Sequence, residues 1–261
     1  MPESGLKAGG KMEKFGGCEV VRTGKTEPVS MEFSSSPYHY CMQVLRAGQM
    51  LENCGLKSFT VFAYEVSEAS SFTVNGRFVE VSRNQAFQVE HAEFKLRLEK
   101  GHAVFLLAGT RESYPGLEGI SSRVCPEIKK VSKPWGHELW INGDSHPGYV
   151  LKQIFIRSGN RTSLQYHRKK EETIVLFSGK MRLHYKTGSC DNDSAGPQDV
   201  GYVDLEPLSA LTNRPGVLHR MESLQDITVY EASTPHLDDV VRVSDDTGRG
   251  DGRIASEHGS R

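Results

Sequence analysis

Short apolar stretches alternate with polar residues along most of the chain, which is the pattern of β-strands rather than of helices. The clearest stretches, rich in β-branched and aromatic residues, are 59–64, 149–156, 173–177 and 227–230. Gly, Asn, Pro and Ser separate them, as expected of tight turns. Two of these turns, Asn75-Gly76 and Ser178-Gly179, lie between apolar runs and predict β-hairpin tips. The pattern therefore predicts an all-β protein.

A weak internal repeat suggests how the strands are grouped. Residues 42–48 resemble residues 152–159, and each segment precedes one of the two predicted hairpins. The repeat predicts two β-barrels. We expect a flexible N-terminus at 1–17, a degenerate barrel with its linker at 18–130, a second barrel at 131–249 and a disordered tail at 250–261. The polar stretch 186–200 predicts a long exposed loop in the second barrel.

Composition narrows the class of protein. The 261 residues carry a formal net charge of -1 with a pI of about 6.8, which argues against a nucleic-acid-binding surface. The first residues are polar and no apolar run reaches membrane-spanning length, so we expect neither secretion nor membrane insertion. The five cysteines are an odd number without a Cys-x-x-Cys pair, which favours reduced thiols and a cytoplasmic protein.

Four potential metal ligands follow one another in an order that fits a single site. Gln165 and His167 would share one face of a strand, Glu172 follows after a turn, and His219 would come from a distant strand. Two imidazoles, a carboxylate and an amide oxygen suit one divalent ion per chain, with Zn expected and Fe, Mn, Co or Ni as alternatives. Glu171 competes with Glu172, since a slip of one residue exchanges their faces. The alternative is a set of hydrogen-bonded polar residues that holds no ion.

Two basic residues are further candidates for the site. Lys152 shares a strand face with Ile154 and Ile156, so burial could lower its pKa and suit it to proton transfer or phosphate contact. The alternative is that the strand faces the other way and Lys152 is solvated. Arg220 follows His219 and would point away from it in a regular strand, although a turn after Pro215 could bring both side chains to the mouth of the barrel.

The order of these residues resembles the two motifs of the cupin superfamily. The matching pattern is Gly159-x5-Gln165-x-His167-x4-Glu172-x6-Gly179 followed by Pro215-Gly216-x2-His219. Gln165 stands where the first motif more usually has a histidine. The resemblance implies a bicupin, with two jelly-roll barrels of which the N-terminal one is degenerate.

Flanking segments resemble a narrower group, the type II mannose-6-phosphate isomerase domain found at the C-terminal end of bifunctional isomerase/guanylyltransferase enzymes. The segments are Lys133-Pro134-Trp135-Gly136-His137-Glu138 and Asp238-Asp239-Val240-Val241-Arg242 through Gly248-Arg249. The likeness covers roughly residues 131–249. One departure is Lys170, which stands where the family has an arginine. Lysine keeps the charge but loses bidentate binding of phosphate or carboxylate.

The resemblance implies a metal-dependent aldose–ketose isomerase that acts on a phosphorylated or other anionic sugar through a cis-enediolate. Lys152 and Glu171 are the candidate bases, and Lys170 and Arg220 are the candidates to hold the anionic group. Alternatives are another metal-dependent cupin enzyme, such as an epimerase, lyase or dioxygenase, and a non-catalytic sugar-binding bicupin. We expect a sugar or sugar phosphate as ligand, a homodimer, and no nucleic-acid or membrane partner.

Overall fold

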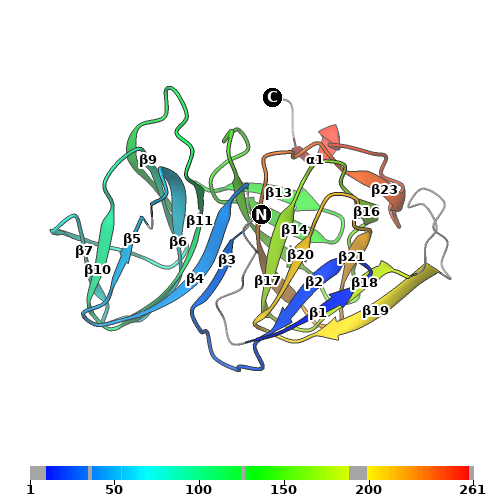
Figure 1. Ribbon diagram of the computed structural model, residues 1–261, viewed down its shortest axis with the longest axis horizontal. Helices are drawn as coiled ribbons and strands as arrows, with labels where there is room; N and C mark the ends of the chain where they lie inside the picture. Colours follow the sequence, from blue (N-terminus) through cyan, green and yellow to red (C-terminus); the bar gives the residue numbers. More distant parts are fainter. Residues whose placement is uncertain (1–9, 35–36, 54, 125–126, 188–198, 259–261) are drawn as a thin grey trace. The chain divides into compact units, whose positions relative to one another are not determined.

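In the computed structural model the chain forms two compact units (Figure 1). The structure describes residues 10–34, 37–53, 55–124, 127–187 and 199–258. Among these, unit 1 contains residues 27–129 and Ile141–Leu151, and unit 2 contains residues 10–26, Lys130–Trp140 and the residues from Lys152 onward. Nearly every element in both units is a strand, so the all-β prediction is confirmed. The predicted loop at 186–200 lies mostly outside the described residues.

Two antiparallel sheets build unit 1. The six-stranded sheet has the order β12-β9-β6-β11-β4-β3 and the four-stranded sheet the order β5-β10-β7-β8. The strands of the larger sheet are β3 (Met31–Ser34), β4 (His39–Arg46), β6 (Ser58–Val66), β9 (Gln85–Glu90), β11 (His102–Thr110) and β12 (Gly119–Val124). Those of the smaller sheet are β5 (Met50–Glu52), β7 (Ser71–Val74), β8 (Arg77–Val79) and β10 (Lys95–Lys100).

Apolar side chains from both sheets fill the interior of unit 1. Aliphatic residues of this core include Leu96, Leu98 and Leu107. Five phenylalanines contribute to it as well: Phe59, Phe72, Phe87, Phe94 and Phe105. Phe72 and Phe105 pack edge to face with ring centroids 5.9 Å apart. Such aromatic packing adds stabilisation beyond the burial of apolar area.

A buried polar cluster ties residues 141–151 to unit 1. Ser58 Oγ lies 2.9 Å from His146 Nε2, which is 3.1 Å from Glu90 Oε1. The hydroxyls of Thr60 and Tyr149 lie 2.8 Å apart. The boundary predicted at residue 130 was therefore wrong for this segment, because these side-chain contacts join partners 56 to 89 residues apart in sequence.

Unit 2 contains the other two sheets. The eight-stranded sheet has the order β1-β2-β20-β17-β22-β15-β14-β13 and the five-stranded sheet the order β19-β18-β21-β16-β23. The strands of the larger sheet are β1 (Lys11–Phe15), β2 (Cys18–Arg22), β13 (Lys129–Lys133), β14 (Gly136–Trp140), β15 (Val150–Ile156), β17 (Glu172–Ser178), β20 (Ser209–Asn213) and β22 (Ile227–Ser233). Those of the smaller sheet are β16 (Leu164–Tyr166), β18 (Met181–Lys186), β19 (Val200–Leu205), β21 (His219–Ser223) and β23 (Val241–Ser244).

Both ends of the chain differ from the prediction. Residues 11–15 form β1 within the predicted flexible N-terminus, and β2 pairs with β20, so this hairpin belongs to unit 2 (Figure 1). Buried Cys18 and Val20 of β2 join the apolar core of unit 2. In the predicted disordered tail, residues 255–258 form the short helix α1 (Ala255–His258). Side-chain ion pairs order this segment, as described below.

The two predicted turns have different outcomes. Asn75 and Gly76 both adopt positive φ and connect β7 to β8 as a hairpin, as predicted. Gly179 also has positive φ, but β17 and β18 belong to different sheets, so this turn is a corner between sheets and the hairpin prediction was wrong. A Cβ at Gly179 would lie 2.1 Å from the carbonyl oxygen of Asp226, which excludes a larger residue.

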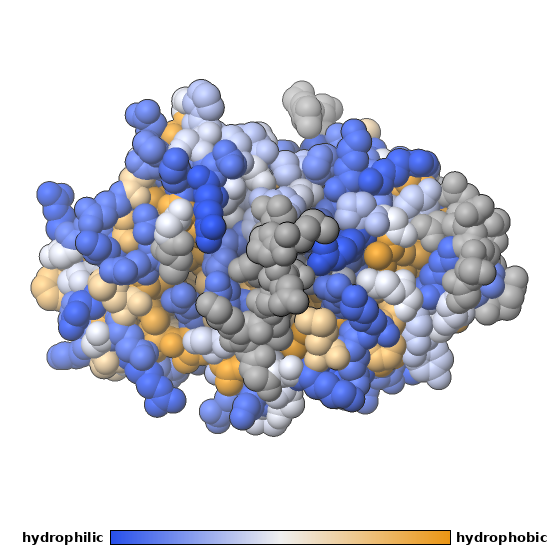
Figure 2. Space-filling model, in the orientation of Figure 1, coloured by the Kyte–Doolittle hydropathy of each residue, from blue (hydrophilic) through white to orange (hydrophobic). Residues whose placement is uncertain are grey.

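Hydrophilic side chains predominate on the face shown in Figure 2, with apolar residues in smaller patches between them. The described large apolar side chains that are exposed come from five strands, β1, β5, β8, β12 and β19: Met12, Met50, Phe78, Ile120, Val124 and Tyr202. Scattered exposure of this kind is ordinary for a protein surface. Among the described residues, no helix has the length and apolar character needed to cross a membrane.

Candidate metal centre

Two buried histidines in unit 2 present the same ring nitrogen to one carboxylate. His167 follows β16, and its Nδ1 hydrogen-bonds the backbone carbonyl of Asp239. His219 begins β21, and its Nδ1 lies 3.0 Å from the carbonyl oxygen of Val217. A carbonyl only accepts, so in each neutral ring Nδ1 carries the proton and Nε2 keeps its lone pair. Carbonyl partners of this kind orient metal-binding histidines.

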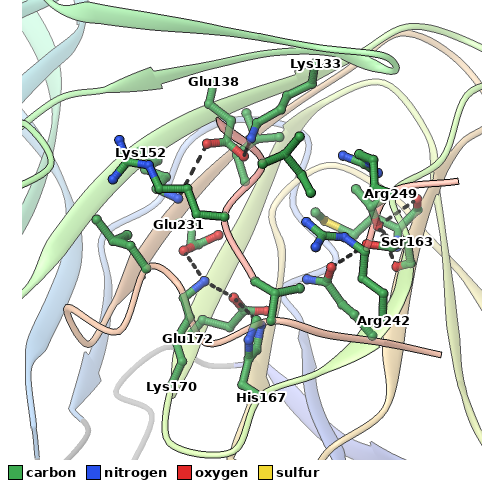
Figure 3. Close-up of a pocket in the computed structure, with 18 of the residues that line it drawn as sticks. Lys133, Glu138, Lys152, Ser163, His167, Lys170, Glu172, Glu231, Arg242 and Arg249 are labelled. Carbon is green, nitrogen blue, oxygen red and sulfur yellow. Dashed lines mark hydrogen bonds and ion pairs between the residues drawn. The ribbon is translucent and has the colours of Figure 1, made fainter. Parts of the chain in front are cut away.

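Glu172, the first residue of β17, contacts both imidazoles, and Figure 3 shows it beside His167. Its Oε1 is 2.9 Å from His219 Nε2, and its Oε2 is 3.5 Å from His167 Nε2. One ligand atom from each of the three residues lies within 4.8 Å of the others. Within the part of the chain that the structure describes, the buried Nε2 of His167 has no hydrogen-bond partner. An unpaired buried nitrogen beside a carboxylate and a second imidazole fits a divalent ion.

Gln165 lines the same cavity but has a different immediate partner. It lies on β16 directly opposite His219 of β21, which places both side chains at one position along the sheet. Its Oε1 accepts a hydrogen bond from Ser163 Oγ at 2.5 Å. All four predicted ligands therefore line one cavity, and three of them converge.

Lys170 is buried and already engaged by two carboxylates. Its ammonium lies 2.5 Å from Glu172 Oε2 and 2.7 Å from Glu231 Oε1 (Figure 3). Burial alone would lower the pKa of Lys170, but these carboxylates outweigh it and raise the pKa above its usual value. Burial opposes ionisation of Glu172 too, yet the ammonium of Lys170 holds the pKa of Glu172 well below its usual range. Lys170 is thus a resident counter-ion of the site, and the prediction that it holds a substrate anion loses its basis.

A second charged group lines another wall of the cavity. Lys152 of β15 is buried, as its shared face with Ile154 predicted, and its Nζ lies 3.5 Å from Glu138 Oε2. The same ammonium is 4.5 Å from the ring centroid of Trp140, whose Nε1 donates to Glu138 at 2.7 Å. Burial opposes the ionisation of Glu138, but Lys152 and Lys133 lower its pKa to about 2. Glu138 therefore remains a carboxylate that fixes the position of Lys152.

The C-terminal segment supplies residues that the sequence did not assign to the site. Arg242, Arg249 and Arg253 line the cavity together with Glu257 of α1. Glu257 lies 2.8 Å from Lys133 Nζ and 3.4 Å from Arg249 Nη1. These ion pairs hold residues 249–257 against the strand that carries Lys133. Residues 250–261 were predicted to be a disordered tail because they show no apolar periodicity. Ion pairs between residues far apart in the chain produce no periodic pattern in the sequence.

Two predicted site residues do not line the cavity. Arg220 is buried on the other face of β21 from His219, where its Nη2 donates to the carbonyl of Ser244 at 2.9 Å and lies 3.5 Å from Asp246. Glu171 is half-buried outside the cavity wall, and its backbone N–H donates to Thr234 Oγ1. Both predictions were wrong about placement, because the alternation of a strand sends neighbours of His219 and Glu172 to the opposite face.

The cavity is small and its charge favours anions. Its volume is about 90 Å³. Among the described residues its wall has six basic side chains, Lys133, Lys152, Lys170, Arg242, Arg249 and Arg253, against four carboxylates, Glu138, Glu172, Glu231 and Glu257. A divalent ion at the histidines would increase the positive excess. Desolvated positive charge in an enclosed site attracts a negatively charged ligand.

The sequence and the structure were compared with those of known proteins. No protein-family model matches the sequence. A search of curated proteins likewise finds no match.

Solved structures, in contrast, match most of the chain at low sequence identity. The putative glyoxylate-induced protein of Pseudomonas aeruginosa is 13% identical with a TM-score of 0.63, covering 89% of this chain and 94% of its own. Oxalate decarboxylase of Lactobacillus farciminis, in a formate complex, is 11% identical with a TM-score of 0.56 and coverages of 88% and 86%. A Bacillus subtilis oxalate decarboxylase described with Mn(II) centres is 12% identical, with a TM-score of 0.55 and coverages of 88% and 76%.

These neighbours are cupin-fold proteins, which supports the cupin part of the predicted resemblance. The mannose-6-phosphate isomerase part stays a prediction. With two all-β units and neighbours that match across both, the chain has the bicupin fold.

Proposed function

We propose that the chain is a metal-dependent enzyme that acts on a small, oxygen-rich anion in the cavity of unit 2. The observation that carries the proposal is the convergence of His167, Glu172 and His219, with the unpaired Nε2 of His167 directed at the carboxylate. The oxalate decarboxylase neighbours, one of them described with Mn(II) centres, agree with a metal-dependent reaction on a small anion. A divalent ion held there would neutralise negative charge that develops on substrate oxygens.

Residues of the chain then provide positioning and proton transfer. Lys152 is the acid–base candidate, because its ammonium lines the cavity and is held between Glu138 and the face of Trp140. Lys170 fixes Glu172 and Glu231, so that both carboxylates keep their positions when substrate enters. The carbonyl of Asp239 fixes the ring of His167. Leu237, Val240 and Ile254 contribute apolar surface to the wall and exclude water.

Cavity size favours a substrate of few carbon atoms. A volume of about 90 Å³ is below the roughly 300–1,000 Å³ typical of pockets for larger ligands. A small carboxylate fits this space better than a sugar phosphate does. The aldose–ketose isomerase implied by the sequence resemblance is the second candidate, favoured by a buried lysine, Lys152, in the wall of the same cavity as the metal ligands.

Metal content tests the centre directly. The protein would be stripped with a chelator, reloaded with Mn, Fe or Zn, and analysed for bound metal after desalting. We expect about one ion per chain in the wild type and a large loss in His219→Ala. The matched control is His184→Ala, because His184 lies on the neighbouring strand β18, outside the cavity wall, with Glu222 as its partner. Equal metal content in both variants would contradict the proposed centre.

Turnover tests the reaction class. Reloaded protein would be assayed with oxalate and related small carboxylates and with aldose phosphates, following substrate loss, oxygen consumption and deuterium uptake from heavy water. We expect Lys152→Met to lower kcat by about 10²–10⁴-fold while metal content stays unchanged, as for the loss of a general acid–base group. Full activity of His219→Ala protein in chelator would exclude a metal-dependent reaction. Tight ligand binding without turnover would favour a non-catalytic bicupin.

A further inference from the structure

One arginine of the cavity wall is fixed in position with a donor unused. Arg242 of β23 donates from Nη1 to the carbonyl oxygens of Gly250 and Gly252, the latter at 2.8 Å. Its Nε is buried and, considering only described residues, has no hydrogen-bond partner. Burial and the nearby Arg249 lower the pKa of Arg242, so no adjacent carboxylate fully compensates its charge. A buried donor of this kind is costly unless a ligand satisfies it.

The neighbouring cations of the wall already have partners. Arg249 donates to Asp245 from Nε and Nη2, and its Nη1 reaches Glu257. Lys133 is 2.8 Å from Glu257. Lys170 is bound by two carboxylates, as described above. Arg242 is therefore the member of the wall whose charge and geometry are best suited to an incoming anion.

Arg253 extends the same part of the wall. It lines the cavity, and its guanidinium lies 5.7 Å from the ring centroid of Trp140. The carbonyl groups of Gly250 and Gly252 hold the guanidinium of Arg242 in place. Arg253 is the residue that follows Gly252. Gly252, whose carbonyl holds Arg242 of β23, thus leads directly into Arg253, and both arginines belong to the wall of one cavity. Planar guanidinium groups bind carboxylate and phosphate oxygens in a bidentate manner.

We propose that Arg242 and Arg253 form an anion subsite, separate from the metal ligands, which binds a carboxylate or phosphate group of the substrate. That the bound anion is a substrate rests on the proposed function. In that function the metal would hold one end of a small anion, and the arginines would hold its charged group. It also assigns specificity to residues 250–253, which lie beyond the segment that carries the sequence resemblance.

The subsite can be tested without metal and without turnover. The chain has two tryptophans, Trp135 and Trp140, and both line the cavity, so their fluorescence reports ligands there. Chelator-treated protein would be titrated with inorganic phosphate and, separately, with malonate, with calorimetry as a second readout. We expect saturable binding of at least one anion, weakened about tenfold or more in Arg253→Gln and in Arg242→Gln, as for a hydrogen bond to a charged group. The stronger of the two ligands distinguishes phosphate from carboxylate chemistry.

Three further variants complete the test. Arg214→Gln removes the same charge from an exposed position outside the cavity and should bind as the wild type does. Arg242→Lys keeps the charge and should recover only part of the affinity, because lysine lacks the planar pair of donors. His184→Ala changes a histidine outside the cavity wall and should leave anion binding intact. Circular dichroism would verify that each variant folds.

The outcomes separate this proposal from the proposed function. Absence of saturable binding by both readouts, or equal weakening in Arg214→Gln, overturns the subsite. If the wild type takes up no metal but the arginine variants still lose anion binding, the proposed function fails and the subsite stands. If metal loading and turnover are normal and the arginine variants keep the wild-type KM, the subsite fails and the function stands.

Discussion

The interiors of the two units show opposite uses of one fold. In unit 1 five phenylalanines and their aliphatic neighbours fill the space between the sheets. In unit 2 the apolar core is accompanied by a cavity whose wall has ten ionisable groups of Lys, Arg and Glu in addition to the two histidines. Apolar packing stabilises the first interior, whereas paired charges permit chemistry in the second at the expense of desolvation.

Corresponding strands make the comparison concrete. Both β4 and β15 lead to a glycine with positive φ, Gly48 and Gly159 respectively. Counting back seven residues from each glycine gives Cys41 in unit 1 and Lys152 in unit 2. Cys41 belongs to the apolar core of its unit, while Lys152 lines the cavity of the other. The same count from the turn glycine thus gives an apolar core residue in unit 1 and a charged residue of the cavity wall in unit 2.

The largest expected effect is on packing in unit 1. Phe105→Ala should reduce the free energy of unfolding by about 3–5 kcal/mol, because a fully buried ring in contact with Phe72 leaves a cavity. Urea denaturation followed by far-ultraviolet circular dichroism measures the change. Phe78→Ala is the matched control in the same unit, since Phe78 is 82% exposed, and should change the value by less than about 0.5 kcal/mol. Comparable losses in both variants would contradict the assignment of Phe105 to a tightly packed core.

The next effect concerns charge in unit 2 and depends on pH. The pKa of Glu138 is about 2 in the folded chain against 4.5 for the free group, so its ionised form stabilises the fold above about pH 4.5. This contribution, about 3 kcal/mol, is lost as the pH falls from 4.5 towards 2. Glu138→Gln should therefore be less stable than the wild type near pH 7, and the difference should shrink in acid.

Urea denaturation at several pH values, followed by tryptophan fluorescence, measures this difference. Both tryptophans belong to unit 2, so the signal reports the unit that contains Glu138. Glu206→Gln is the control, because Glu206 is an exposed partner of Lys180 and should show only a small, nearly constant difference. A Glu138→Gln deficit of the same size at pH 7 and pH 3 would contradict the role of the ionised carboxylate.

The smallest expected loss comes from making unit 2 more like unit 1. Replacing both members of the buried pair, Lys152→Met with Glu138→Leu, should cost less stability than Glu138→Gln alone. Apolar residues of similar volume avoid the desolvation cost of the two charges. Metal content should be retained and turnover lost. A double variant much less stable than Glu138→Gln alone would show that the pair supports the fold rather than the chemistry.

The sequence predicted the features that depend on local geometry. Strand alternation placed Gln165 with His167, and Lys152 with Ile154, and the structure brings these residues into the cavity wall. Fold class followed from the same periodicity. The second partner of Lys170 was not predictable, since Glu231 lies on a strand 61 residues away and no spacing rule joins them.

Other residues whose position depends on long-range contacts could not be predicted from the sequence either, because partners far apart in the chain leave no local pattern. The ion pair of Lys133 with Glu257 spans 124 residues, and it orders a segment with no apolar pattern of its own. The hairpin β1–β2 joins unit 2 because β2 pairs with β20. No local sequence pattern in β2 or β20 indicates this pairing. The alternation of side chains along a strand also explains why Arg220 and Glu171 are not part of the site. Both have suitable side chains for substrate binding or proton transfer, but these lie outside the cavity wall.

The division of labour within the cavity wall has an evolutionary consequence. The converging ligands come from β16, β17 and β21 or the residues next to them, whereas Arg242, Arg253 and Glu257 come from the last stretch of the chain. Substitutions, insertions or recombination in that terminal stretch can alter which ligand is accepted while the coordinating residues remain untouched.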